Sequence, residues 1–93
     1  MTKADLILAV SEKSQITKVK AEMVVETIFD SIKEVLKKGD RVEIRGFGCF
    51  EVRHYDGYKG RNPKTSEVIE VHEKLLPFFK AGKELKNRVD RTS

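Results

Sequence analysis

The stretch YKGRNPKT, residues 58–65, places a rigid apolar ring among cations. Arg61 and Lys64 flank Pro63, and Asn62 directly precedes it. Lysine and arginine neutralise nucleic-acid phosphates, and an asparagine amide can donate to and accept from a base edge. A proline at the tip of a β-ribbon can enter between base pairs, unstack them and kink the duplex. Basic residues around a proline are more often a solvated turn, so both interpretations stay open at this point.

Residues that could support catalysis or bind a metal are sparse. His54 and His72 are not at a spacing typical of metal ligands, and Cys49 has no companion cysteine for a zinc site. The carboxylates accompany no glycine-rich phosphate loop and no nucleophile elbow. We therefore expect surface histidines and carboxylates, with no metal, no cofactor, no small-molecule substrate and no enzymatic activity.

The chain has 93 residues and a net charge of +4, and the positive charge is gathered in its second half. Residues 1–45 hold nine Lys and Arg against eight Asp and Glu, whereas residues 46–93 hold ten against seven. This balance favours an acidic partner such as nucleic acid. The first residues lack the apolar core of a secretory signal, no apolar run is long enough to span a membrane, and one cysteine permits no internal disulfide. We expect one small domain, away from membranes, in a reducing compartment.

Two helices are predicted at the start of the chain. Thr2 and Asp5 form a capping-box pattern before the first, and Thr17 can cap the second. In the second helix apolar residues recur at three- and four-residue steps: Ala21, Val24, Val25, Ile28, Ile32, Val35 and Leu36. Two lysines followed by Gly39 end it. The pattern predicts a helical hairpin over residues 1–39.

The apolar period then changes to two, which is typical of strands. Residues 41–45 alternate, and the Gly46-Phe47-Gly48 stretch predicts a tight reversal into a second strand. Further strands are predicted at 68–71 and 75–79, the latter at a sheet edge because it contains Pro77. Residues 83–89 predict a short helix with its apolar residues, Leu85 and Val89, facing inward.

The segment 53–74 is predicted to be two strands joined by the turn at residues 60–63. Their outer halves carry little apolar surface, and an isolated two-stranded hairpin is marginal in water. We expect an arm that is mobile alone and ordered on a partner. The whole order predicts an α+β domain over residues 1–93: a helical part at 1–39, an antiparallel sheet with this arm at 40–82, and a helix with a tail at 83–93.

Three motifs together resemble the bacterial HU and integration host factor family of DNA-bending proteins: GFGCF at 46–50, GRNPKT at 60–65 and FKAGK at 79–83. The similarity covers essentially the whole chain. The resemblance implies an intertwined dimer with a helical body and a β-saddle, whose two arms wrap the minor groove of double-stranded DNA. It further implies that Pro63 intercalates, and that the protein organises the bacterial nucleoid in the cytoplasm and assists recombination, replication or transcription complexes.

Within this family the chain resembles the β subunit of integration host factor more than HU, through RVEIRGFG at 41–48, GRNPKT at 60–65 and FKAGKELKNR at 79–88. By this resemblance Arg45 inserts where the groove is narrow and gives indirect readout of sequence. An exposed cross-strand charge set is the alternative. The implied DNA contacts of the body are Lys3, Arg41, Arg45, Gly46, Gly48, Lys80, Lys83 and Lys86. Those of the arm are Arg53, Tyr55, Tyr58, Lys59, Gly60, Arg61, Asn62 and Lys64.

Some positions depart from the family pattern. Tyr55 and Tyr58 stand where arms commonly carry arginines, and tyrosine can bond a phosphate but releases no counterion. Ser66 stands where a glycine is usual. The acidic residues of the returning strand are expected to point away from phosphates or to pair with nearby lysines: Glu67, Glu70 and Glu73, with Lys59, Lys64 or Lys74.

The aromatic residues of the second half favour pairing with another chain. Phe47, Phe50, Phe78 and Phe79, with the aliphatic second helix, are more apolar surface than one thin layer should leave exposed. An ordinary monomeric core is the alternative. We expect a dimer with Phe47, Phe50 and Phe79 in its core, and the partner is either identical or a related subunit.

Two other functions remain as alternatives. One is an HU-like DNA compactor without site preference, against which Arg45 argues. The other is a basic RNA-binding or ribosome-associated module that uses the same charge without bending DNA.

Overall fold

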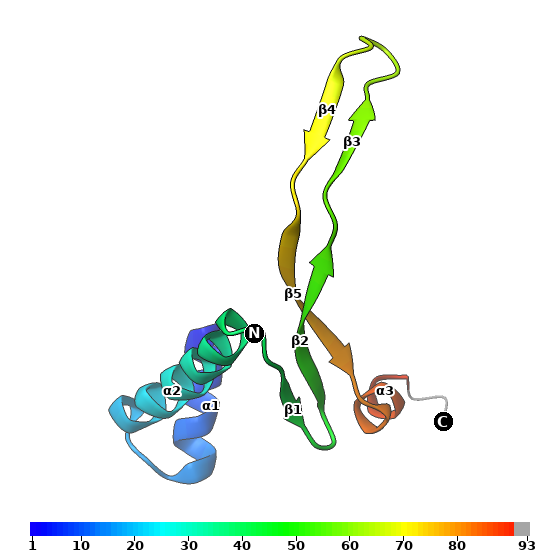
Figure 1. Ribbon diagram of the computed structural model, residues 1–93. Coiled ribbons are helices and arrows are strands. Elements are labelled where there is room, and N and C mark those ends of the chain that lie inside the picture. The colour runs from blue at the N-terminus through cyan, green and yellow to red at the C-terminus, as the bar shows by residue number, and fades with distance from the viewer. Residues whose placement is uncertain (91–93) are drawn as a thin grey trace.

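The computed structural model describes residues 1–90. Figure 1 shows two helices on one side of a sheet, a long two-stranded arm that extends away from it, and a short helix on the other side. This is the α+β class expected from the sequence, with the helical hairpin first, the antiparallel strands next and the short helix last.

The helical hairpin consists of α1 (Lys3–Ser14) and α2 (Lys18–Lys37). The Thr2 hydroxyl accepts a hydrogen bond from the Asp5 backbone N–H, and the Asp5 carboxylate accepts one from the Thr2 N–H. This completes the predicted capping box. The Thr17 hydroxyl caps α2 by accepting from the Lys20 N–H. Both helix starts are therefore fixed by local side chains, as the sequence indicates.

The main sheet has three antiparallel strands in the order β1-β2-β5: β1 (Val42–Ile44), β2 (Gly48–Tyr55) and β5 (Lys74–Ala81). The reversal between β1 and β2 is closed by a 3.0 Å hydrogen bond from the Phe47 N–H to the Ile44 carbonyl. Pro77 lies in β5, which is an edge strand within this chain, so the missing proline N–H breaks no ladder here.

The arm is a separate two-stranded sheet made of β3 (Tyr58–Arg61) and β4 (Val68–Val71). Its register continues that of the main sheet, since β2 ends with Tyr55 opposite Lys74 and β3 begins with Tyr58 opposite Val71. Residues 56–57 and 72–73 lie between the two sheets and belong to neither. Arg53 and Tyr55, placed on the arm from sequence, therefore lie in the main sheet.

The last element, α3 (Lys83–Val89), has the bounds predicted from the sequence. Leu85 is half-buried as expected. Val89 is 73% exposed, so the expectation that it faces inward is wrong. Helical spacing shows which residues share a face, but not how far the neighbouring surface extends along it.

The core of a single chain is very small. Among residues 1–90 only Ala21 and Val25 are buried hydrophobic residues. The radius of gyration is 19.5 Å, against about 12 Å for a compact domain of this length. The accessible surface is 8182 Å², against about 5,500 Å² for a compact monomer of this mass. One chain by itself thus leaves much of its apolar surface in water.

The longest helix of residues 1–90, α2, carries charged residues along its whole length. None of the helices in that range is long and apolar enough to span a bilayer.

Candidate nucleic-acid interface

The main sheet has two chemically different faces. Residues directly opposite each other in an antiparallel pair share a face, and Phe50 lies opposite Phe79. The Phe79 ring packs 4.8 Å from that of Phe50 and 5.2 Å from that of Phe47, centroid to centroid. The three residues expected in a dimer core therefore form one aromatic cluster. This is the apolar face of the sheet.

The other face carries charge, and we call it the polar sheet face. Glu43 lies opposite Cys49, which lies opposite Lys80, so these three share a side. By alternation along the strands, that side holds five cations and two acids: Arg41, Arg45, Arg53, Lys74 and Lys80 with Glu43 and Glu51. Most of them line one open hollow of the surface. The face therefore gathers side chains from three strands and has a net positive charge.

Two of the five cations are paired with acids. Nη2 of Arg41 lies 3.9 Å from Oε2 of Glu43, and Nε of Arg53 lies 3.7 Å from Oε1 of Glu51. Within residues 1–90, Arg45, Lys74 and Lys80 have no ion pair. These three are therefore the cations of this face that can bind an anion without leaving a carboxylate.

Two glycines shape the edge of this face. Gly46 has a φ of +82°, which glycine adopts without strain. A Cβ on Gly48 would lie 2.6 Å from the Lys80 carbonyl oxygen and 2.6 Å from the Phe79 ring. Both were predicted DNA contacts. The structure gives them a further role, because they let β2 approach β5 closely and turn the chain back from β1.

The tip of the arm is held by the residues around Pro63. Oδ1 of Asn62 accepts a 2.9 Å hydrogen bond from the Lys64 N–H. The Asn62 backbone donates to the Glu67 carbonyl and accepts from the Ser66 N–H, both at 2.8 Å. Pro63 is exposed on this frame. The predicted base contact, Asn62, thus already uses its side-chain oxygen to fix the turn.

Ser66 adopts the left-handed region, with a φ of +60°. This conformation favours glycine, the residue that the family pattern has at this position, and costs a serine roughly 1–2 kcal/mol. The departure noted in the sequence therefore raises the conformational cost of the tip turn.

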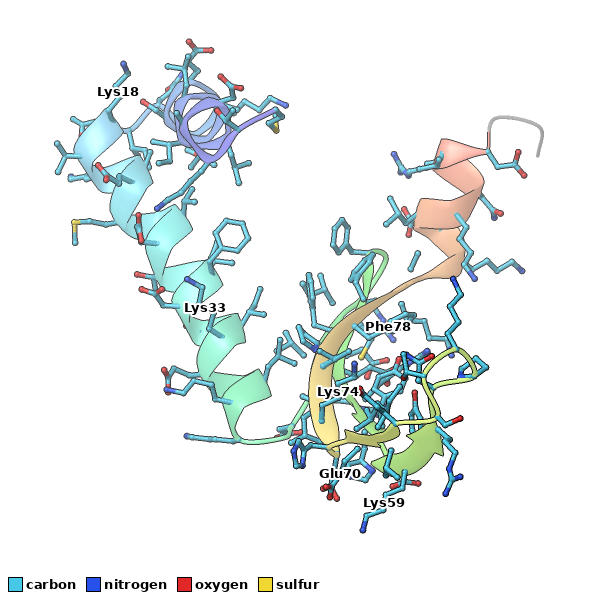
Figure 2. All side chains as sticks on the ribbon, turned by 90° about the horizontal axis from the view of Figure 1, so that it is seen from above. Lys18, Lys33, Lys59, Glu70, Lys74 and Phe78 are labelled. Atoms are coloured by element: carbon cyan, nitrogen blue, oxygen red, sulfur yellow. The ribbon has the colours of Figure 1, made fainter. Side chains whose placement is uncertain are left out.

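The arm strands place cations and an acid opposite each other. Lys59 lies opposite Glu70, and Figure 2 shows the two labelled side chains close together on the arm. Arg61 lies opposite Val68, and Tyr58 opposite Val71. Lys59 and Arg61 therefore project from one side of the arm and Tyr58 from the other. The sequence left Glu70 either to point away from phosphates or to pair with a lysine. The register places it opposite Lys59, although no ion pair joins them among the described residues.

Glu73 has a different partner from the predicted one. Its Oε1 lies 2.8 Å from Nε2 of His54, whereas a lysine partner or a solvated position was expected. Asp56 lies 3.4 Å from Nδ1 of the same ring. The hydrogen bond to Glu73 raises the pKa of His54 above its ordinary value of 6.5, and the charges of Glu73 and Asp56 act in the same direction. Sequence reasoning missed this cluster, whose signal lies in the strand register.

The body lysines are not all close to one another in one chain. Lys80, Lys83 and Lys86 lie at the end of β5 and on α3. Lys3 lies on α1, which Figure 1 and Figure 2 show on the opposite side of the sheet from α3. Lys3 is paired with Glu26 of α2, and this contact raises the pKa of Lys3. Lys18 and Lys33, labelled on α2 in Figure 2, also lie away from the polar sheet face.

Comparisons with known proteins decide the family. A family model described as bacterial DNA-binding protein matches residues 1–90. The chain belongs to the HU family of bacterial DNA-binding proteins. It is 49% identical to DNA-binding protein HU of Geobacillus stearothermophilus over 89 residues, which cover 96% of this chain and 99% of the relative. It is 45% identical to HU of Clostridium pasteurianum over 91 residues, 98% of this chain and 100% of the relative.

Solved structures of HU proteins also match the fold. The HU chain of an Anabaena HU–DNA cocrystal structure superposes with a TM-score of 0.83 at 40% identity, covering 96% of this chain and 97% of that one. HU from Thermotoga maritima gives 0.69 at 34% identity, covering 96% and 98%. The α+β fold and the family expected from the sequence are confirmed, and the narrower likeness to integration host factor stays a prediction.

Proposed function

We propose that this HU-family chain is an architectural DNA-binding protein that acts as a dimer, binds the minor groove of double-stranded DNA and bends it by inserting Pro63 from each arm. The observation that carries the proposal is the setting of Pro63, exposed at the far end of the arm in a turn that Asn62 fixes by three hydrogen bonds. Unstacking a base step costs a few kcal/mol, so a wedge must be rigidly held.

The distribution of cations supports the proposal. Within the arm, alternation directs Lys59 and Arg61 to the same side. Below them lie Arg45 and Lys80, which have no acidic partner within residues 1–90. A line of cations from saddle to tip would follow a phosphate backbone and release counterions along it, which offsets the cost of the wedge.

The apolar face supports a dimer, either of identical chains or with a related subunit. Phe47 is 42% exposed although it belongs to the aromatic cluster, and α2 leaves Ile28 and Phe29 exposed. Such surface is typical of an obligate pair whose core is shared. Two chains also supply two arms, and hence two kinks in one duplex. The role requires no catalysis, and its place would be the nucleoid in the bacterial cytoplasm, in support of recombination, replication or transcription complexes.

A duplex labelled at both ends tests bending by fluorescence energy transfer. We expect the end-to-end distance to shorten at saturating protein. An unchanged distance at saturation would rule out bending. The Pro63→Ala variant is the matched control: it should keep much of the phosphate binding but bend less, because the cations remain while the wedge is lost. Equal bending by both proteins would argue against intercalation.

A second candidate is a site-preferring protein like the β subunit of integration host factor, and Arg45 favours it. Its guanidinium has no carboxylate partner within residues 1–90 and lies on the polar sheet face, where it can enter a narrow minor groove. Footprinting on random and A-tract DNA separates this protein from an HU-like compactor, which should protect both evenly. Competition between duplex DNA and structured RNA at matched salt tests the RNA-binding alternative.

A further inference from the structure

Phe78 lies on the polar sheet face, where a large apolar ring has no evident packing role. It is 36% exposed, and it sits opposite Glu51 in the register of β2 and β5. Cζ of Arg53 lies 3.4 Å from the centre of the Phe78 ring. Arg53 is opposite Leu76, so the contact runs diagonally between the two strands. The guanidinium is therefore stacked on the ring. Figure 2 shows Phe78 on the β5 side of this sheet.

The Glu51 carboxylate forms an ion pair with the same guanidinium. Its Oε1 lies 3.7 Å from Nε of Arg53. An arginine stacked on an aromatic ring still has its in-plane N–H donors, because hydrogen bonds form at the edge of the guanidinium and stacking uses its face. With Nε beside Glu51, the edge formed by the two Nη groups is the one left for another acceptor.

We propose that Phe78 is a positioning residue for DNA binding, whose ring holds the Arg53 guanidinium flat over the sheet with its Nη edge available to a phosphate or base-edge acceptor of the duplex. This inference rests on the proposed function. The inference extends the proposed function, because it assigns a role in DNA binding to an uncharged residue of β5 that orients a charged neighbour.

The physical basis is pre-organisation. A free arginine side chain loses much rotamer freedom when it binds a ligand, and a stacked one has lost part of it already. Removing the ring should therefore weaken duplex binding through Arg53 alone. From the strength of exposed cation–π contacts, we expect a loss of about two- to five-fold in affinity.

The test is a double-mutant cycle on the full chain, with one duplex of fixed sequence as the probe. The variants are Arg53→Ala, Phe78→Leu, Phe78→Tyr and the Arg53→Ala/Phe78→Leu double variant. Leucine keeps apolar bulk without a ring, and tyrosine keeps the ring. We expect Phe78→Leu to weaken binding, Phe78→Tyr to match the parent, and the double variant to bind no worse than Arg53→Ala alone.

The salt dependence of binding separates positioning from a merely structural effect. Losing one phosphate contact lowers the slope of log affinity against log salt by about 0.9, so Arg53→Ala should show this and Phe78→Leu part of it. A variant that is only partly folded lowers the active fraction and leaves the slope unchanged. Thermal unfolding of each variant checks the fold independently.

Each failure is distinct. If the parent protein does not bind duplex DNA, the proposed function is wrong. If the parent binds and Arg53→Ala weakens binding, but Phe78→Leu equals the parent or its effect adds fully to that of Arg53→Ala, the positioning role is overturned. An Arg53→Ala variant that binds as tightly as the parent also overturns it.

Discussion

His54 and Glu73 are joined where the main sheet gives way to the arm, with Nε2 of the histidine 2.8 Å from Oε1 of the glutamate. His54 is near the end of β2, and Glu73 directly precedes β5. Asp56 lies on the other side of the ring, 3.4 Å from Nδ1. The cluster thus ties together the two strands at the base of the arm, and its strength depends on the charge of one imidazole.

This cluster predicts that the stability of the junction between the arm and the main sheet depends on pH. The hydrogen bond to Glu73 raises the pKa of His54 above 6.5, so its stabilisation is fully present below the unfolded value and is lost as pH rises through the folded value. We expect higher protection factors, which correct exchange rates for the intrinsic pH dependence of amide exchange, around Glu73 at about pH 6 than at about pH 8.

An NMR titration of the His54 ring measures this directly. In the Glu73→Gln variant the titration midpoint should fall, because the amide cannot stabilise the imidazolium as the carboxylate does. Asp56→Asn is the milder control, since its contact is longer. A midpoint that Glu73→Gln leaves unmoved would contradict the prediction.

Gly48→Ala should destabilise the protein by roughly 1–3 kcal/mol, because the new methyl group would overlap the Lys80 carbonyl and the Phe79 ring. The free energy of unfolding from urea denaturation measures the loss. Gly60→Ala is the matched control: a Cβ there meets only the Tyr58 ring, at 3.7 Å, and it should cost much less. Equal losses for the two variants would count against close approach at Gly48.

The thermal midpoint should rise with protein concentration. A folded state that needs a second chain to cover its apolar face is stabilised by mass action. Unfolding scans over a hundred-fold concentration range, with the mass in solution from sedimentation, test this. A constant midpoint together with a monomeric mass would contradict shared burial of Phe47 and Phe79.

Hydrogen exchange should distinguish the arm from the main sheet. The amides of β3 and β4 belong to an isolated pair of strands with little apolar cover, so they should exchange quickly in the free protein. The β2 and β5 amides should be better protected. Added duplex DNA should slow exchange in the arm. Arm amides as protected as those of β2 without DNA would show that the arm is stable by itself.

Local signals determine much of the fold and could be predicted from sequence. The Thr2–Asp5 capping box, the Thr17 cap and the bounds of α3 all depend on residues within one turn. Alternation also placed Val42 and Ile44 in a strand. Val89 shows what such local signals cannot predict. Its exposure depends on how far the neighbouring surface extends along the helix, which the helical period does not determine.

The contacts that were missed depend on register. The pairing of His54 with Glu73 joins residues 19 positions apart and the stacking of Arg53 on Phe78 joins residues 25 apart, and a shift of one residue would separate both. That register is set by the tip turn, where Asn62 and Ser66 fix the reversal. Sequence patterns predicted a wedge and its cations, which stay predictions, but did not indicate which neighbours hold these side chains.

The strand ladder is interrupted at residues 56–57 and 72–73, so fewer inter-strand hydrogen bonds resist bending between the arm and the main sheet. If the arm and the main sheet were one rigid ribbon, Pro63 would approach a duplex at a single angle. A change in DNA curvature would then displace it from between the base pairs. If the ribbon bends between the arm and the main sheet, the contacts of the arm with DNA can be kept while those of the main sheet adjust. The same protein could then serve duplexes of differing curvature without a different fold.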